Sequence, residues 1–115
     1  MKRSVVVDAS VAVRWVVRGS DWASAVAVLL EKRDDLVELE APAIQPAEVA
    51  SALAKYVRFG RMSADQVRAS FAEYWALAPR LYDTRRLARS AFDLALAHRW
   101  SVYDCLYLAL SIELR

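Results

Sequence analysis

The feature that most constrains the fold is a run of three valines, Val5 to Val7, which follows basic residues and ends at Asp8. Its apolar residues do not alternate with polar ones, and β-branched residues favour extended backbone. A run of this kind is typical of a strand in a parallel sheet with helices on both faces. It therefore predicts a strand over Ser4–Val7, buried on both faces, in an α/β fold.

The rest of the chain alternates apolar strand patterns with helix patterns, which supports the α/β class. Further strands are predicted over Leu36–Ala41 and Arg80–Asp83. Six helices are predicted over about 10–18, 21–32, 46–59, 63–78, 84–97 and 101–115, with Ser20, Ser63, Thr84 and Ser101 as residues that begin them. Apolar stripes are expected to include Leu30 of the second helix and Trp75 of the fourth. The last helix is apolar all round over Cys105–Leu110, which predicts burial on more than one side.

The length and composition limit the class of protein. A chain of 115 residues with 57% hydrophobic residues suits a single domain, 1–115. No apolar stretch approaches the roughly 20 residues of a membrane span, and no signal-type segment follows the N-terminus. The single cysteine, Cys105, excludes an internal disulfide. We expect a cytoplasmic protein with no membrane association.

Three acidic residues stand where parallel strands and helices meet. Asp8 directly follows the first strand, Glu48 lies in the first turn of the third helix, and Asp104 lies in the first turn of the last helix. Carboxylate oxygens are the ligands that magnesium and manganese prefer, and metals held by acids promote phosphodiester hydrolysis. Since ligands bind beyond the carboxyl ends of parallel strands, these positions indicate a metal site.

The same three acids have a purely structural interpretation. A helix N-terminus favours negative charge by roughly 0.3–1 kcal/mol, so each acid stabilises a helix start without a metal. Asp8 is placed to cap the first helix, and Ser101 with Asp104 resembles a capping box. Spacing alone leaves both interpretations open. Asp8 favours the metal site most, because a carboxylate against a buried strand is costly without a partner.

Arginine is the dominant base, at 13 of the 16 basic residues, although the net charge is only +2. Arginine binds phosphate in a forked geometry, so Arg14, Arg85 and Arg86 are candidate phosphate contacts. GC-rich coding accounts for the arginine content equally well, and solvated helix faces account for the positions.

The three acidic motifs resemble those of the PIN-domain family, and of its VapC-type toxins in particular. The resemblance is carried by Val5–Val11, by Pro46–Val49 with Leu53, and by Ser101–Leu110. It implies a PIN-like parallel sheet flanked by helices, with Asp8, Glu48 and Asp104 as catalytic metal ligands and Ser10 as a supporting hydrogen-bond donor. It also implies Mg²⁺- or Mn²⁺-dependent cleavage of RNA, a VapB-like antitoxin as partner, and a homodimer.

The sequence departs from the family after the sixth helix. Family members continue with a fourth strand beside the first, a fourth acidic motif, a further helix and a short strand, whereas this sequence stops at Arg115. We therefore expect a PIN domain truncated at its C-terminus, with an exposed apolar edge at Val5–Val7.

Two other functions compete with the metal-dependent ribonuclease. One is a non-catalytic, truncated PIN module that binds antitoxin or RNA without cleaving it. The other is a phosphatase with Asp8 as nucleophile, which the sequence disfavours because Ser10 stands where such enzymes have a second aspartate.

Overall fold

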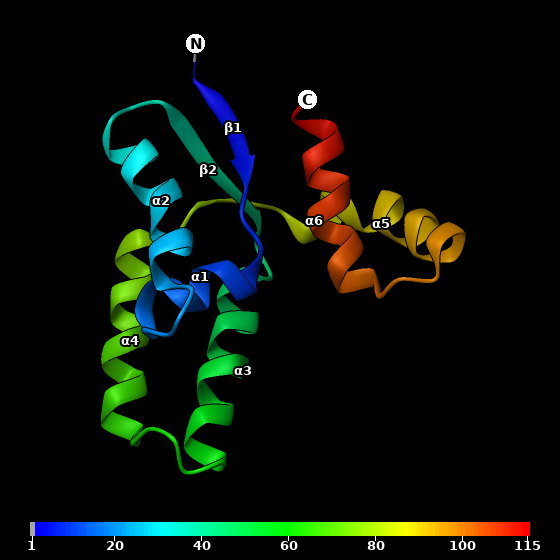
Figure 1. Ribbon diagram of the computed structural model, residues 1–115. Helices are drawn as coiled ribbons and strands as arrows, with labels where there is room; N and C mark the ends of the chain where they lie inside the picture. The colour runs from blue at the N-terminus through cyan, green and yellow to red at the C-terminus, as the bar shows by residue number, and fades with distance from the viewer. Residues whose placement is uncertain (1) are drawn as a thin grey trace.

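The computed structural model describes residues 2–115 and contains three strands and six helices within them (Figure 1). The strands are β1 (Arg3–Val6), β2 (Val37–Pro42) and β3 (Arg80–Tyr82). The helices are α1 (Ala9–Val16), α2 (Trp22–Arg33), α3 (Gln45–Arg58), α4 (Ala64–Leu77), α5 (Thr84–His98) and α6 (Val102–Glu113). Each predicted strand and helix is present, with its ends displaced by a few residues.

The strands form one parallel sheet in the order β1-β2-β3. Val6 of β1 lies opposite Glu40 of β2, and Glu40 lies opposite Arg80 of β3. Because all strands run in the same direction, their carboxyl ends meet at one edge of the sheet, where Asp8 follows β1. The predicted α/β class with a parallel sheet flanked by helices is confirmed.

Alternate residues of β1 face two separate cores, as the two-residue period of a strand requires. Val5 and Val7 pack in a core with helices α1 to α4, whereas Val6 packs in a second core with α5 and α6. Figure 1 shows the two groups of helices on opposite sides of the sheet. The first group carries α3 and α4 as a projecting pair of antiparallel helices.

The predicted burial of the first strand is wrong for its first half. Arg3 and Ser4 are exposed, and Val5 and Val6 are half-buried. The physical reason is that β1 lies at the edge of the sheet, with β2 as its one strand neighbour among residues 2–115. Only at Val7, which is 4% exposed, do helices cover the chain fully.

Burial of the last helix is confirmed, with Cys105, Leu106, Tyr107, Ala109 and Leu110 all buried. It lies against the second face of the sheet, contacting β1 and β2, and also packs along α5. Contact on two sides is what a helix without a polar stripe requires. No helix among the described residues is long and apolar enough to cross a membrane.

Four details of the helix pattern are wrong. Helix α2 begins after Asp21 rather than Ser20, and α5 begins after Asp83, whose side chain accepts a hydrogen bond from the Arg85 N–H. Aspartate is preferred over threonine as a helix cap, which accounts for Asp83. The Asp21 side chain makes no capping hydrogen bond and pairs with Arg14 instead. Leu30 and Trp75 are 46% and 62% exposed, because their helices lie on the outside of the first core.

Candidate functional site

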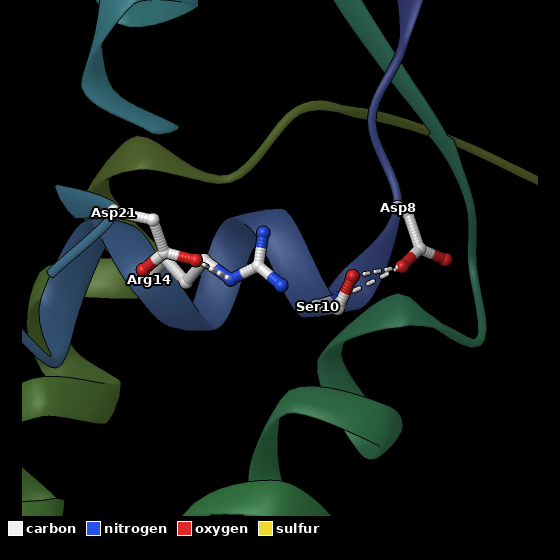
Figure 2. Close-up of polar contacts among 4 residues, drawn as sticks. All are labelled: Asp8, Ser10, Arg14 and Asp21. Carbon is white, nitrogen blue, oxygen red and sulfur yellow. Dashed lines mark hydrogen bonds and ion pairs between the residues drawn. The ribbon is translucent and has the colours of Figure 1, made fainter. Parts of the chain in front are cut away.

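Asp8 is both the end of the first strand segment and the N-terminal cap of α1. Its Oδ2 atom accepts a hydrogen bond from the Ser10 backbone N–H at 3.1 Å and a second one from the Ser10 hydroxyl (Figure 2). The predicted contact between Ser10 and a carboxylate is therefore present. Both side chains are exposed, so Oδ1 of Asp8 remains open to solvent and to a ligand.

Glu48 lies in the first turn of α3, half-buried, and is held by α6. The Tyr107 hydroxyl donates a hydrogen bond to Glu48 Oε1 at 2.8 Å. Burial raises the pKa of the Glu48 carboxyl, the bond from Tyr107 opposes that shift, and repulsion from Asp8 and Asp104 raises the pKa further. Burial, together with the bond to Glu48, also raises the pKa of the Tyr107 hydroxyl, which therefore stays protonated as a donor.

Asp104 lies in the first turn of α6. Its backbone N–H donates to the Ser101 hydroxyl at 3.0 Å, which begins the helix as predicted. The carboxylate of Asp104 is exposed and receives no hydrogen bond from any of the residues 2–115. Only half of a capping box is thus formed, and the acid is free to face the other two carboxylates.

The three predicted acids come together at the carboxyl edge of the sheet. Glu48 experiences the negative charge of both Asp8 and Asp104, which are far from it in sequence. An all-carboxylate set that repels itself fits a hard divalent cation, because the cation removes the repulsion. Within residues 2–115, however, no group of three or more acidic, histidine or cysteine side chains is placed so that it could hold a metal ion. The type of donor therefore fits a divalent metal, whereas the placement of the three carboxylates in this structure does not form a metal site.

Two consecutive buried hydrogen bonds, which the sequence did not predict, connect this edge of the sheet to the first core. The Gln45 side chain donates to the Val7 carbonyl at 2.7 Å, and the Tyr74 hydroxyl donates to Gln45 Oε1 at 2.9 Å. Gln45 and Tyr74 are both fully buried, and burial raises the pKa of Tyr74 to about 12. These two hydrogen bonds fix the backbone directly before Asp8 against the start of α3. The one sign of these bonds in the sequence is Gln45 itself, a polar residue among apolar ones at the start of α3.

A second unpredicted polar residue is Glu40 on β2. It is 2% exposed, and its Oε2 atom has no hydrogen-bond partner among the described residues. Its position opposite Val6 places it on the face covered by the second core. Glu40 lies two residues before the end of β2, and its charge is not among those that act on Glu48.

The candidate phosphate contacts are spread over the molecule. Arg14 lies one turn beyond Ser10 on α1 and forms an ion pair with Asp21 at 3.0 Å (Figure 2). Arg86 forms an ion pair with Glu113 at the last turn of α6, nine residues and roughly 13 Å from Asp104 along that helix. Arg85 lies beside Arg86 in the first turn of α5. Arg14 is thus the one of the three that lies on the helix capped by Asp8. Phosphate binding by Arg14, Arg85 and Arg86 remains a prediction.

Burial of the Glu48 carboxyl, together with repulsion from Asp8 and Asp104, leads to a prediction on stability. We expect Glu48→Gln to raise the melting temperature of the metal-free chain at pH 7 by about 2 to 4 °C, the shift that roughly 0.5 kcal/mol gives in a domain of this size. Because the pKa of Glu48 is raised on folding, its ionisation destabilises the fold as the pH rises above the unfolded value of 4.5, and the amide removes that loss.

The measurement is thermal unfolding with chelator present, between pH 4 and pH 8. Glu73→Gln on the exposed side of α4 is the matched control and is expected to have no such effect. A lower melting temperature for Glu48→Gln than for the control at pH 7 would show that the ionised Glu48 carboxylate does not destabilise the fold.

The comparison with protein families gives one match. The sequence model described as PIN domain matches residues 5–115 of the chain, which is nearly all of it. No curated protein matches the chain closely enough to count as a relative. The match includes all three acidic residues of the site and the sheet and helices that bring them together.

Proposed function

Because the chain belongs to the PIN-domain family, whose members are in general metal-using nucleases that act on RNA, we propose that it is an endoribonuclease toxin of the VapC type. The observation that supports the proposal is that Asp8 and Asp104, although distant in sequence, both lie close enough for their charges to act on Glu48. Asp8 and Glu48 accept hydrogen bonds from the hydroxyl groups of Ser10 and Tyr107. A role in stabilising helix starts does not require these two bonds.

In the proposed mechanism, Asp8, Glu48 and Asp104 would hold Mg²⁺ or Mn²⁺. Such an ion, when bound, stabilises negative charge on the phosphate and promotes deprotonation of the attacking water. Ser10 keeps Oδ2 of Asp8 occupied and thereby aims Oδ1 outward. Tyr107 does the same for Glu48, leaving Oε2 free. Ser101 fixes the first turn of α6 and so the position of Asp104.

The partners proposed with this function are RNA as substrate, a VapB-like antitoxin and a second copy of the chain, in the cytoplasm. The support for protein partners is the exposed apolar surface on α5 and just after it. Phe92, Leu96 and Trp100 are 55%, 66% and 55% exposed. Large exposed apolar side chains that lie close together are typical of surfaces at which proteins associate.

Metal removal tests the proposed activity. We expect cleavage of single-stranded RNA with Mg²⁺ or Mn²⁺ present, a loss of at least about 100-fold with EDTA, and recovery when excess metal is restored. The rate of product formation from an end-labelled RNA measures it. The second candidate, a PIN module that binds RNA or antitoxin without cleavage, is favoured if RNA binds in both conditions and stays intact. The observation behind that alternative is that no group of side chains within residues 2–115 is placed so that it could hold a metal ion.

A further inference from the structure

One face of α3 continues from the acidic site to the far end of the projecting helix pair. Glu48, Ala52, Lys55 and Phe59 are spaced by four, three and four residues, so they lie on one side of the helix. From Glu48 to Phe59 the helix rises about 16 Å, the length of roughly five stacked nucleotides. We refer to these four residues, with Tyr56 and Arg61, as the α3 face.

The α3 face is hollowed at its outer end. A cavity of about 410 Å³ is lined by Ala52, Lys55, Tyr56, Phe59 and Arg61. Ala52 and Tyr56 pack against the first core and form its floor, whereas Phe59 is 72% exposed. The cavity therefore has a rigid floor and an aromatic ring that is free to contact a ligand.

The residues that line the cavity carry positive charge only, from Lys55 and Arg61. Between Glu48 and Asp65 the chain has three basic residues, Lys55, Arg58 and Arg61, and no acidic one. None of the three forms an ion pair with any of residues 2–115, whereas Arg14, Arg33, Arg68 and Arg86 each do. Cations left without protein partners around an exposed aromatic ring are suited to a polyanion with stacking bases.

On these observations we propose that the α3 face binds single-stranded RNA adjacent to the scissile phosphate, with a base stacked on Phe59 and phosphates held by Lys55 and Arg61. This inference rests on the proposed ribonuclease function and specifies which surface of the chain holds the RNA beside the acidic site. A single strand fits better than a duplex, because the bases of a duplex are paired and cannot stack on a side chain. The path from Glu48 to Phe59 is continuous along one helix, so the strand passes directly from the acidic site to the cavity.

The test measures RNA binding in a chain that does not cleave. In the Asp8→Asn background, the dissociation constants of a 3-nucleotide and a 12-nucleotide single-stranded RNA are determined over a range of salt concentrations. We expect the longer RNA to bind more tightly, and Phe59→Ala to weaken it by about fivefold or more. Phe59→Trp retains the stacking surface and is expected to retain the affinity. The 3-nucleotide RNA, which is too short to reach Phe59, is expected to be unaffected.

The charges are tested separately with Lys55→Gln/Arg61→Gln. Each lost phosphate contact is expected to reduce the slope of log affinity against log salt by about 0.7, hence about 1.4 for both. Lys32→Gln/Arg33→Gln on α2 removes the same charge elsewhere and is the matched control. All of these side chains are exposed, so the melting temperatures of the variants are expected to equal that of the parent chain.

Two results overturn the inference. One is an unchanged affinity and salt slope for the 12-nucleotide RNA in both the Phe59→Ala and Lys55→Gln/Arg61→Gln variants. The other is unchanged RNA binding with loss of binding to a synthetic peptide of alternating acidic and aromatic residues, which would make the face a protein-docking surface. Failure of the proposed function has a different signature: the parent chain binds RNA through the α3 face and does not cleave it.

Discussion

Asp8→Asn is expected to reduce metal-dependent RNA cleavage by about 100-fold or more while leaving the fold intact. Asparagine keeps one oxygen that accepts the Ser10 N–H, and it begins helices as well as aspartate does. What it lacks is the negative charge that a divalent cation requires of its ligands. The loss is therefore expected in activity and in metal affinity, with an unfolding free energy within roughly 0.5 kcal/mol of the parent chain.

The structure offers an unusually close control for this change. Asp83 caps α5 as Asp8 caps α1, because its Oδ1 atom accepts the backbone N–H of the residue two positions later, Arg85, at 3.0 Å. Asp83 is not among the acids whose charge acts on Glu48, so Asp83→Asn makes the same chemical change at the same kind of cap. We expect it to retain cleavage. Comparable losses for the two variants would mean that Asp8 acts only as a helix cap, and the metal-site interpretation would then be wrong.

The strand and helix pattern was largely predictable because it follows from local rules. The valine run before Asp8, Pro46 in the first turn of α3, and the unbroken apolar stretch of α6 each signal one element without reference to the rest of the chain. The parallel sheet follows from strands that alternate with helices. The meeting of Asp8, Glu48 and Asp104 follows in turn, since parallel strands bring their carboxyl ends to one edge.

What the sequence could not predict depends on contacts between distant residues. Tyr107 appears in the sequence as one more apolar residue of α6, and only its approach to Glu48 gives its hydroxyl a role. Glu40 appears to belong to a solvent-facing alternation with Glu38, yet the second core buries it. Trp75 shares an apolar stripe with Tyr74, but the direction of packing leaves Trp75 exposed and buries Tyr74. None of these outcomes is determined by periodicity alone.

Gln45→Leu is expected to lower the free energy of unfolding by roughly 2 to 4 kcal/mol, the largest stability effect we predict for a single polar residue of this chain. Leucine is similar in size, so the loss does not come from a cavity. It comes from two buried partners left without a hydrogen bond, the Val7 carbonyl and the Tyr74 hydroxyl, at about 1 to 3 kcal/mol each. Denaturant unfolding monitored by circular dichroism measures it.

Two comparisons distinguish the loss of these hydrogen bonds from a general sensitivity of position 45 to substitution. Gln66→Leu removes an exposed glutamine that caps α4 and is expected to cost at most about 1 kcal/mol. Gln45→Leu/Tyr74→Phe removes both members of one hydrogen bond, so its loss is expected to be smaller than the sum of the two single losses. Strict additivity would mean that Tyr74 and Gln45 do not act together.

The same variant links stability to the site. Gln45 begins α3, three residues before Glu48, and holds the carbonyl of the residue before Asp8. The Gln45 side chain thus sets where two of the three acids stand relative to each other. At a temperature where Gln45→Leu remains folded, we expect cleavage to fall as well, with weaker binding of Mn²⁺ in a calorimetric titration. Full metal affinity in the folded variant would show instead that Gln45 serves the core alone and that the acids are positioned by α6 and Ser10.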